Sequence, residues 1–168
     1  RDSSEDQHYH SFIDAAKRQI IISGVTLSEW FVRDEFHRKF LGKLHENASV
    51  TFLLLDSDSS NFTDRQREDG EVAGNRTIDR YISTLEFLVA NFDSLAPHIS
   101  NGRLQILFYS SEPISLLVFD EVLIWDIYLP RVKNKRSPRI YLEKGGNFSE
   151  VVYSALSDVM EKARGTSG

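Results

Sequence analysis

Apolar residues in this chain follow two spacings, one typical of amphipathic helices and one typical of buried strands. Apolar positions recurring every three or four residues predict helices over residues 8–18, 33–46, 76–95 and 148–163. Short, continuously apolar runs predict strands over residues 19–27, 50–55, 104–109, 116–119, 122–125, 127–129 and 139–142. The polar segment 61–75 has neither spacing and is predicted to be a long, mobile loop of the kind that forms a lid. Pro97 and the turn at 100–102 are predicted to end the third helix.

The order of these elements predicts an α/β fold. Helices alternate with strands in the first half, which requires parallel crossovers, whereas the closely spaced strands of the second half indicate antiparallel pairing. We therefore expect a mixed sheet flanked by helices on both faces. Residues 1–164 show no internal repeat or linker and are predicted to form one domain, with residues 165–168 as a flexible tail.

Composition narrows the class of protein. The chain has 168 residues, 40% of them hydrophobic, and a formal net charge of -5. An acidic balance argues against non-specific nucleic-acid binding, which needs a cationic face. The absence of cysteine excludes disulfides, thiol nucleophiles and zinc–thiolate sites. No apolar run approaches the ~20 residues that span a bilayer. With neither a signal peptide nor a disulfide, we expect a cytoplasmic protein, and the abrupt polar start suggests a domain of a larger regulatory or effector protein.

Two apolar runs, 116–119 and 122–125, flank Asp120-Glu121, the pattern of a hairpin with a tight acidic turn. This hairpin resembles the catalytic hairpin of the phospholipase D-like superfamily, which carries His-x-Lys-x4-Asp with the Asp at the turn. Aligning that Asp with Asp120 places Pro113 at the His and Ser115 at the Lys. The resemblance extends to the helix and strand segments at 15–24 and 40–56, and so covers roughly the whole chain.

The resemblance implies a fold more than a reaction. In active members the His attacks phosphorus, the Lys stabilises the charge on its oxygens, and two such motifs are needed. Proline cannot act as a nucleophile, serine supplies no cation, and this chain has no second motif. We therefore expect a non-catalytic lobe that senses a ligand or holds a partner. Because relatives pair two lobes, the resemblance also implies a homodimer through the hairpin side.

The alternative is a phosphoryl-transfer hydrolase that uses Asp56 and Asp58, either a phosphodiesterase or nuclease or an Asp-x-Asp phosphatase, and a second resemblance supports the phosphatase. Asp56-Ser-Asp58 follows an apolar strand, like the Asp-x-Asp motif of haloacid dehalogenase-like phosphatases. There the first Asp is the nucleophile, the second the acid/base, and Mg²⁺ lies between carboxylate and phosphate. The other interpretation is that Asp and Ser simply end the strand through hydrogen bonds to the turn backbone. The leading interpretation requires neither a cofactor nor a metal.

Open α/β sheets bind ligands outside the carboxyl ends of their parallel strands. Two arginines in the predicted loop are suited to grip a phosphate bidentately, so we expect a small phosphorylated or nucleotide-like ligand. The predicted ligand-binding residues are Thr26, Asp56, Asp58, Arg65, Arg67, Ser115 and Asp120.

Overall fold

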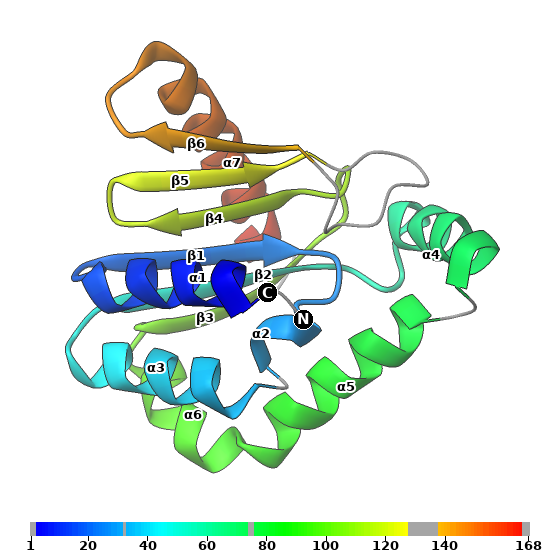
Figure 1. Cartoon of the computed structure of the whole chain (residues 1–168). Coiled ribbons are helices and arrows are strands. Elements are labelled where there is room, and N and C mark those ends of the chain that lie inside the picture. The colour runs from blue at the N-terminus through cyan, green and yellow to red at the C-terminus, as the bar shows by residue number, and fades with distance from the viewer. Residues whose placement is uncertain (1–2, 32, 74–75, 128–137, 166–168) are drawn as a thin grey trace.

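The structure, a computed structural model, describes residues 3–31, 33–73, 76–127 and 138–165 (Figure 1). The predicted strand at 127–129 fails at Ile127, which lies outside any strand, and its other two residues are outside the described ranges. Most of the predicted tail is also outside them. In the described ranges, no helix has the length and apolar character needed to cross a membrane.

Six strands form one mixed sheet in the order β3-β2-β1-β4-β5-β6, as Figure 1 shows. The pair β1·β2 and the pair β2·β3 are parallel, and the pairs β1·β4, β4·β5 and β5·β6 are antiparallel. This confirms the predicted change from parallel to antiparallel pairing. The strands are β1 (Gln19–Gly24), β2 (Ser49–Leu55), β3 (Leu104–Tyr109), β4 (Ser115–Phe119), β5 (Val122–Asp126) and β6 (Arg139–Glu143).

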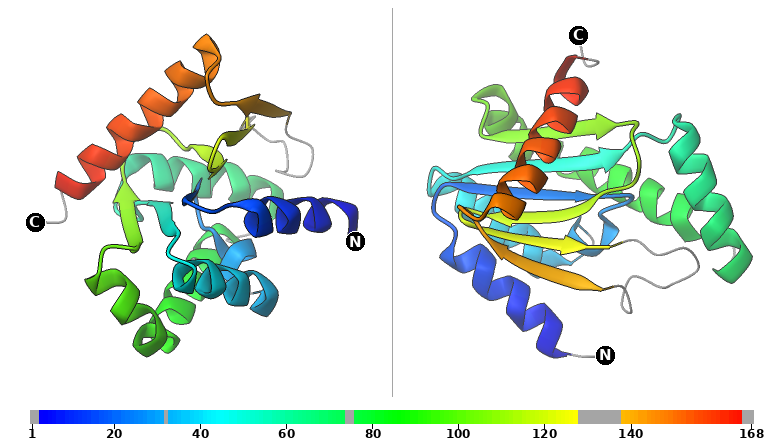
Figure 2. Two further views of the ribbon diagram at one scale, coloured as in Figure 1. Left: turned by 90° about the vertical axis from the view of Figure 1, so that its left-hand side faces the viewer. Right: turned by 90° about the horizontal axis from the view of Figure 1, so that it is seen from above.

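Helices cover both faces of the sheet, as predicted. Figures 1 and 2 show α1 (Ser3–Ala15) and α3 (Asp34–His45) on one face and α7 (Asn147–Gly165) across the other. The central strands are consequently buried on both faces: Ile20 to Ile22 of β1 and Leu53 to Leu55 of β2 are at most 1% exposed. The remaining helices are α2 (Ser28–Phe31), α4 (Ser60–Ala73), α5 (Arg76–Ala90) and α6 (Phe92–Ser100).

The predicted loop at 61–75 is wrong, because most of that segment forms α4. The helix opens where the Ser59 hydroxyl accepts the backbone N–H of Phe62, at 3.1 Å. Phe62 is 2% exposed and packs its ring edge to face against Tyr81, with centroids 5.0 Å apart. Ion pairs between Arg65 and Glu68 and between Arg67 and Asp64 add local support. One aromatic anchor in a polar helix produces no apolar stripe, so hydrophobic spacing does not reveal it.

The third predicted helix is two helices, α5 and α6, and Pro97 lies inside the second instead of ending the first. The break falls at Asn91, whose carbonyl accepts the N–H groups of Ser94 and Leu95 and so starts a new helix. Pro97 is the sixth residue of α6, where it supplies no N–H for the carbonyl of Asp93, and the helix ends three residues later at Ser100.

The hairpin of β4 and β5 lies inside the sheet, with β1 on one side and β6 on the other. Both strands already have two hydrogen-bonded neighbours, so the hairpin offers no free strand edge for a second subunit. The predicted homodimer through the hairpin side stays a prediction, and it would have to use the faces or the turn of the hairpin and not a strand edge.

Candidate functional site

The carboxyl ends of β1, β2 and β3 meet at one edge of the sheet because these strands are parallel. The antiparallel strand β4 begins at the same edge. Four of the predicted residues come together there: Thr26 follows β1, Asp56 and Asp58 follow β2, and Ser115 opens β4. We refer to this end of the sheet as the carboxyl edge.

Asp56 is tied into the turn that follows β2. Its backbone N–H donates to the carbonyl of Tyr109 at 2.7 Å, which joins the turn to the end of β3. Its Oδ1 accepts the backbone N–H of Asp58 at 3.0 Å, and its Oδ2 accepts the Ser110 hydroxyl at 3.5 Å. The Asp56 carboxylate therefore shapes a local turn, as the strand-ending interpretation expects. Asp58 is exposed to solvent at the same place.

Two helices are fixed against the carboxyl edge by side-chain contacts. On α4, Asn61 donates its Nδ2 to the carbonyl of Ser110 at 2.8 Å. On α5, Thr84 is fully buried and donates its hydroxyl to the carbonyl of Thr26 at 2.6 Å. These bonds hold α4 beside β3 and α5 beside β1, so the ends of both strands are bordered by helices.

Tyr81 of α5 brings a phenol to the turn after β2, where it hydrogen-bonds to Ser57. Burial raises the pKa of Tyr81 above its ordinary value, the bonds with Ser57 lower it, and the negative charges of Asp56 and Asp58 raise it. The net direction is upward, so the hydroxyl keeps its proton near neutral pH and remains available as a donor.

The two predicted arginines have different surroundings. Arg65 follows Asn61 by four residues and Phe62 by three, so it shares the α4 face that meets the strand ends. Its side chain is 9% exposed and pairs with Glu68 at 3.2 Å. Arg67 points elsewhere: its side chain is 69% exposed and pairs with Asp64 at 2.8 Å. Arg65 therefore lies on the side of α4 that carries Asn61 and Phe62, whereas Arg67 lies largely in solvent, because residues two apart in a helix point in different directions.

Buried hydroxyls fix the start of β4. Ser23 of β1 is 2% exposed, and its hydroxyl accepts the N–H of Leu116 at 2.8 Å while donating to the same residue's carbonyl at 3.0 Å. The Tyr109 hydroxyl accepts the N–H of Ile114 at 3.0 Å. The backbone between Pro113 and Ser115 is thereby held beside the ends of β1 and β3.

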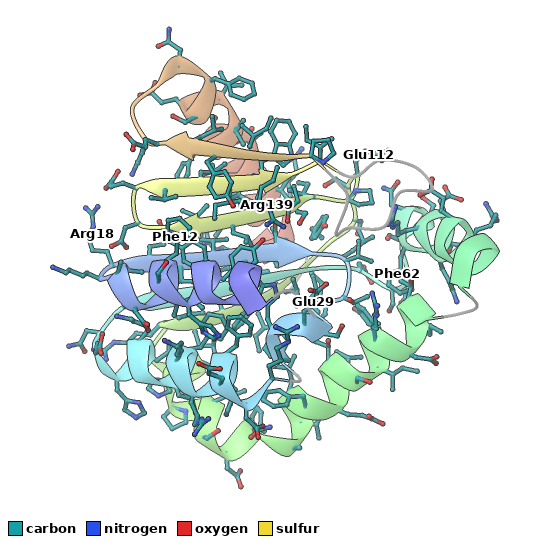
Figure 3. The ribbon with its side chains drawn as sticks, in the orientation of Figure 1. Phe12, Arg18, Glu29, Phe62, Glu112 and Arg139 are labelled. Atoms are coloured by element: carbon teal, nitrogen blue, oxygen red, sulfur yellow. The ribbon has the colours of Figure 1, made fainter. Side chains whose placement is uncertain are left out.

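Asp120 does not belong to the carboxyl edge, and its predicted placement there is wrong. It does occupy the hairpin turn, with φ of 50°, but β4 runs antiparallel to β1 and ends where β1 begins. Its carboxylate accepts backbone N–H groups from Lys17, Arg18 and Gln19 at 2.7, 2.9 and 2.7 Å. Figure 3 labels Arg18 at this end of the sheet and Phe62 and Glu112 at the other.

The charge of Asp120 is stabilised by these donors. Burial alone would raise the pKa of this carboxyl, but the N–H groups of Lys17, Gln19 and Arg18 and the positive charge of Arg18 lower it, and the net shift is downward. The carboxylate thus acts as a structural acceptor that links the start of β1 to the hairpin.

Hydrophobic spacing missed Ser57 in the turn after β2 and the three residues that helices bring to the carboxyl edge, namely Asn61, Tyr81 and Thr84. Tyr81 falls in the apolar register of its helix, and that register indicates packing and not a polar contact. The Ser-rich run after β2 was the available signal, since such runs place several hydroxyls at a strand end. Among the described residues, no three His, Asp or Glu side chains gather closely enough to hold a metal ion.

Neither a protein-family model nor a curated protein matches this chain. Among solved structures, the chain is similar to TrmBL2, described as an archaeal chromatin protein with a novel mode of DNA binding. The TM-score is 0.56 at 10% identity, over 95% of this chain and 50% of that one. At this identity the similarity shows a shared fold and nothing finer. The chain spans about half the length of this neighbour.

Proposed function

We propose that this chain is a non-catalytic, phospholipase D-like domain that binds a small ligand at its carboxyl edge, within a larger regulatory protein. The observation that carries the proposal is the gathering of hydroxyl, carboxylate and guanidinium groups from four segments at that edge. Hydrogen bonds link Asp56 to Asp58 and Ser110, and Tyr81 lies at the same turn. Arg65 lies on the side of α4 that also carries Asn61, which is bonded to Ser110.

The absence of hydrolysis rests on three positions. Pro113 and Ser115 stand where the resemblance requires a nucleophilic imidazole and an ammonium, and neither can replace it. Asp120 lies at the opposite end of the sheet with its oxygens bonded to backbone N–H groups. Loss of both nucleophile and cation removes several kcal/mol of transition-state stabilisation.

The ligand class follows from the mixture of charges. A buried guanidinium, Arg65, favours phosphate, whereas the carboxylates of Asp56 and Asp58 repel it and accept hydrogen bonds from ligand hydroxyls. A ligand with a phosphate at one end and free hydroxyls at the other satisfies both. Nucleotides have this arrangement, and carboxylates commonly bind ribose hydroxyls in α/β sheets. We therefore favour a nucleotide-like ligand over inorganic phosphate.

The regulatory setting is supported by the neighbour of the same fold, which is described as a chromatin protein that binds DNA. This chain corresponds to about half of that protein, which fits a ligand-binding part joined to another part. The net charge of -5 argues against non-specific DNA binding by this domain itself.

The test is ligand-induced stabilisation of the whole chain by AMP, ATP, GTP and inorganic phosphate, measured by urea unfolding. A nucleotide at a hundred times its dissociation constant is expected to add about 2.7 kcal/mol. Arg65→Gln should abolish this increment, whereas the matched exposed variant Arg67→Gln should keep it. The increment is the difference in unfolding free energy between the ligand-bound and ligand-free forms of the same variant. A change in the stability of the ligand-free variant therefore does not affect the result.

Phosphomonoester and phosphodiester reporters, with and without Mg²⁺, complete the test. We expect no turnover. Turnover that disappears in Asp56→Asn would favour the Asp-x-Asp hydrolase instead, and the absence of any stabilisation by the panel would reject the nucleotide site.

A further inference from the structure

The outer side of α5 carries an exposed apolar stripe that continues into α6. Its members are Ile82, Leu85 and Val89 of α5 and Phe92 of α6, which are 46%, 36%, 76% and 57% exposed. The three α5 residues follow one another at intervals of three and four, which places them on one side of that helix, and Phe92 continues the row at the first residue of α6. At about 1.5 Å per residue the α5 part of the stripe is about 10 Å long, or roughly two helical turns.

This stripe is separate from the side of α5 that packs against the protein. That inner side contributes Tyr81 and Thr84, which are 4% and 0% exposed. A surface helix with one buried face normally presents polar residues to solvent. Single exposed apolar residues are ordinary, but a contiguous row of four marks a surface that another molecule covers.

A line of acidic residues runs along the stripe. Asp79, Glu86 and Asp93 are seven residues apart, and each is exposed. Within the described part of the chain, none of the three takes part in an ion pair. The apolar stripe therefore has an uncompensated negative border, which selects for positive charge on whatever covers it.

We propose that the outer side of α5 is the docking surface for an amphipathic helix of a partner protein, whose apolar face is bordered by Lys or Arg. The two-turn stripe on α5, extended by Phe92 at the start of α6, fits the anchors of a helix, and the acidic line fits the basic border. A second copy of the chain fits less well. An antiparallel pair of α5 helices about a two-fold axis places the two acidic lines side by side.

The position of α5 connects this docking surface with the candidate ligand site. Figure 1 shows α5 at the margin of the molecule, and it packs against α2 and α4. Its inner side touches the carboxyl edge through Tyr81 and Thr84. One helix thus contacts the candidate ligand site with one side and the partner with the other. The docking surface itself is independent of whether a nucleotide binds.

The test uses the whole chain and a fluorescein-labelled synthetic amphipathic peptide of about 18 residues, long enough to be helical, with Leu on one face and Lys on its borders. Fluorescence anisotropy should show binding to the wild type and at least about tenfold weaker binding to Val89→Asp. The matched control is Val151→Asp, since Val151 is 67% exposed on α7, away from the stripe, and should leave binding unchanged.

Charge reversal tests the border. The triple variant Asp79→Lys, Glu86→Lys, Asp93→Lys should lose the Lys-bordered peptide and gain a matched peptide with Glu borders. Equal binding of the two peptides to the wild type, or equal loss in both valine variants, overturns the proposal. So does a wild-type dimer that Val89→Asp dissociates, since a second copy would then be the occupant. Urea unfolding confirms that each variant is folded.

Discussion

The turns that contain Asp120 and Asp56 lie at opposite ends of the same sheet, and the two carboxylates accept different sets of hydrogen bonds. Asp120 accepts three backbone N–H groups from residues 101 to 103 positions earlier in the chain. Asp56 accepts one backbone N–H from two residues later and a long bond from Ser110. The amino end of β1 therefore depends on a distant carboxylate, whereas the Asp56 carboxylate mainly shapes the turn that contains it. When an Asp follows an apolar strand, the source of its hydrogen-bond donors indicates its role. Several backbone donors from a distant segment indicate a structural role, whereas few donors leave the carboxylate able to contact a ligand.

The largest expected effect is the loss of the Asp120 acceptor. Asp120→Ala should lower the free energy of unfolding by about 2–3 kcal/mol, because three backbone donors lose a charged partner. Asp120→Asn should cost less, about 1 kcal/mol, since its carbonyl oxygen can still accept from Arg18 and Gln19 and Asn tolerates positive φ. Urea unfolding followed by circular dichroism measures both.

The control for this contrast is Asp58→Ala at the other end of the sheet. Asp58 is exposed, and its side chain accepts no hydrogen bond from a described residue, so its removal should change stability by less than about 0.5 kcal/mol. Equal losses in Asp120→Ala and Asp58→Ala would remove the distinction between the two ends.

The pH dependence of the free energy of unfolding is a second test of the structural role of Asp120. The pKa of Asp120 is lower in the folded protein than its unfolded value of about 3.8. Its stabilising contribution is therefore complete above the unfolded pKa and is lost as the pH falls through the folded pKa. The difference in unfolding free energy between the wild type and Asp120→Asn should be constant from neutral pH down to about 5 and shrink below about 4.

Urea unfolding of both proteins at several pH values measures this difference directly, because the other carboxylates contribute equally to each. A difference that grows as the pH falls would mean that the donors around Asp120 do not favour its charged form.

The sequence predicts most of the sheet because its strands are short apolar runs that stay buried on both faces, as in Ile20–Ile22 and Leu53–Leu55. The sequence does not predict α4, because this helix packs through one buried aromatic side chain, Phe62, and has no periodic row of apolar residues. Local spacing cannot reveal that anchor, since its partner Tyr81 lies on the next helix.

The candidate site is predicted in part for a similar reason. The strand-end rule puts Thr26, Asp56 and Asp58 at one edge of the sheet, because parallel strands share a direction. Ser115 lies at the same edge because it opens an antiparallel strand. The rule misplaces Asp120, which ends an antiparallel strand. It also misses Tyr81 and Thr84, whose contacts depend on how α5 packs across the strand ends, and no local pattern encodes that.

The smallest expected effect on stability is at the carboxyl edge, with Asp56→Asn and Asp58→Asn. In Asp56→Asn the side-chain amide oxygen can still accept the backbone N–H of residue 58. In Asp58→Asn the altered side chain is exposed. The free energy of unfolding of each variant should therefore stay within about 0.5 kcal/mol of the wild type. Ligand binding should respond in a different way. Removing either charge lessens the repulsion of a phosphate and weakens the acceptors for ligand hydroxyls, so inorganic phosphate should bind more tightly while the advantage of AMP over phosphate narrows. Calorimetric titration of both ligands measures this ratio. If either variant lost much stability while the ratio of AMP to phosphate affinity stayed unchanged, these carboxylates would serve only to stabilise the fold. Their role would then be the same as that of Asp120.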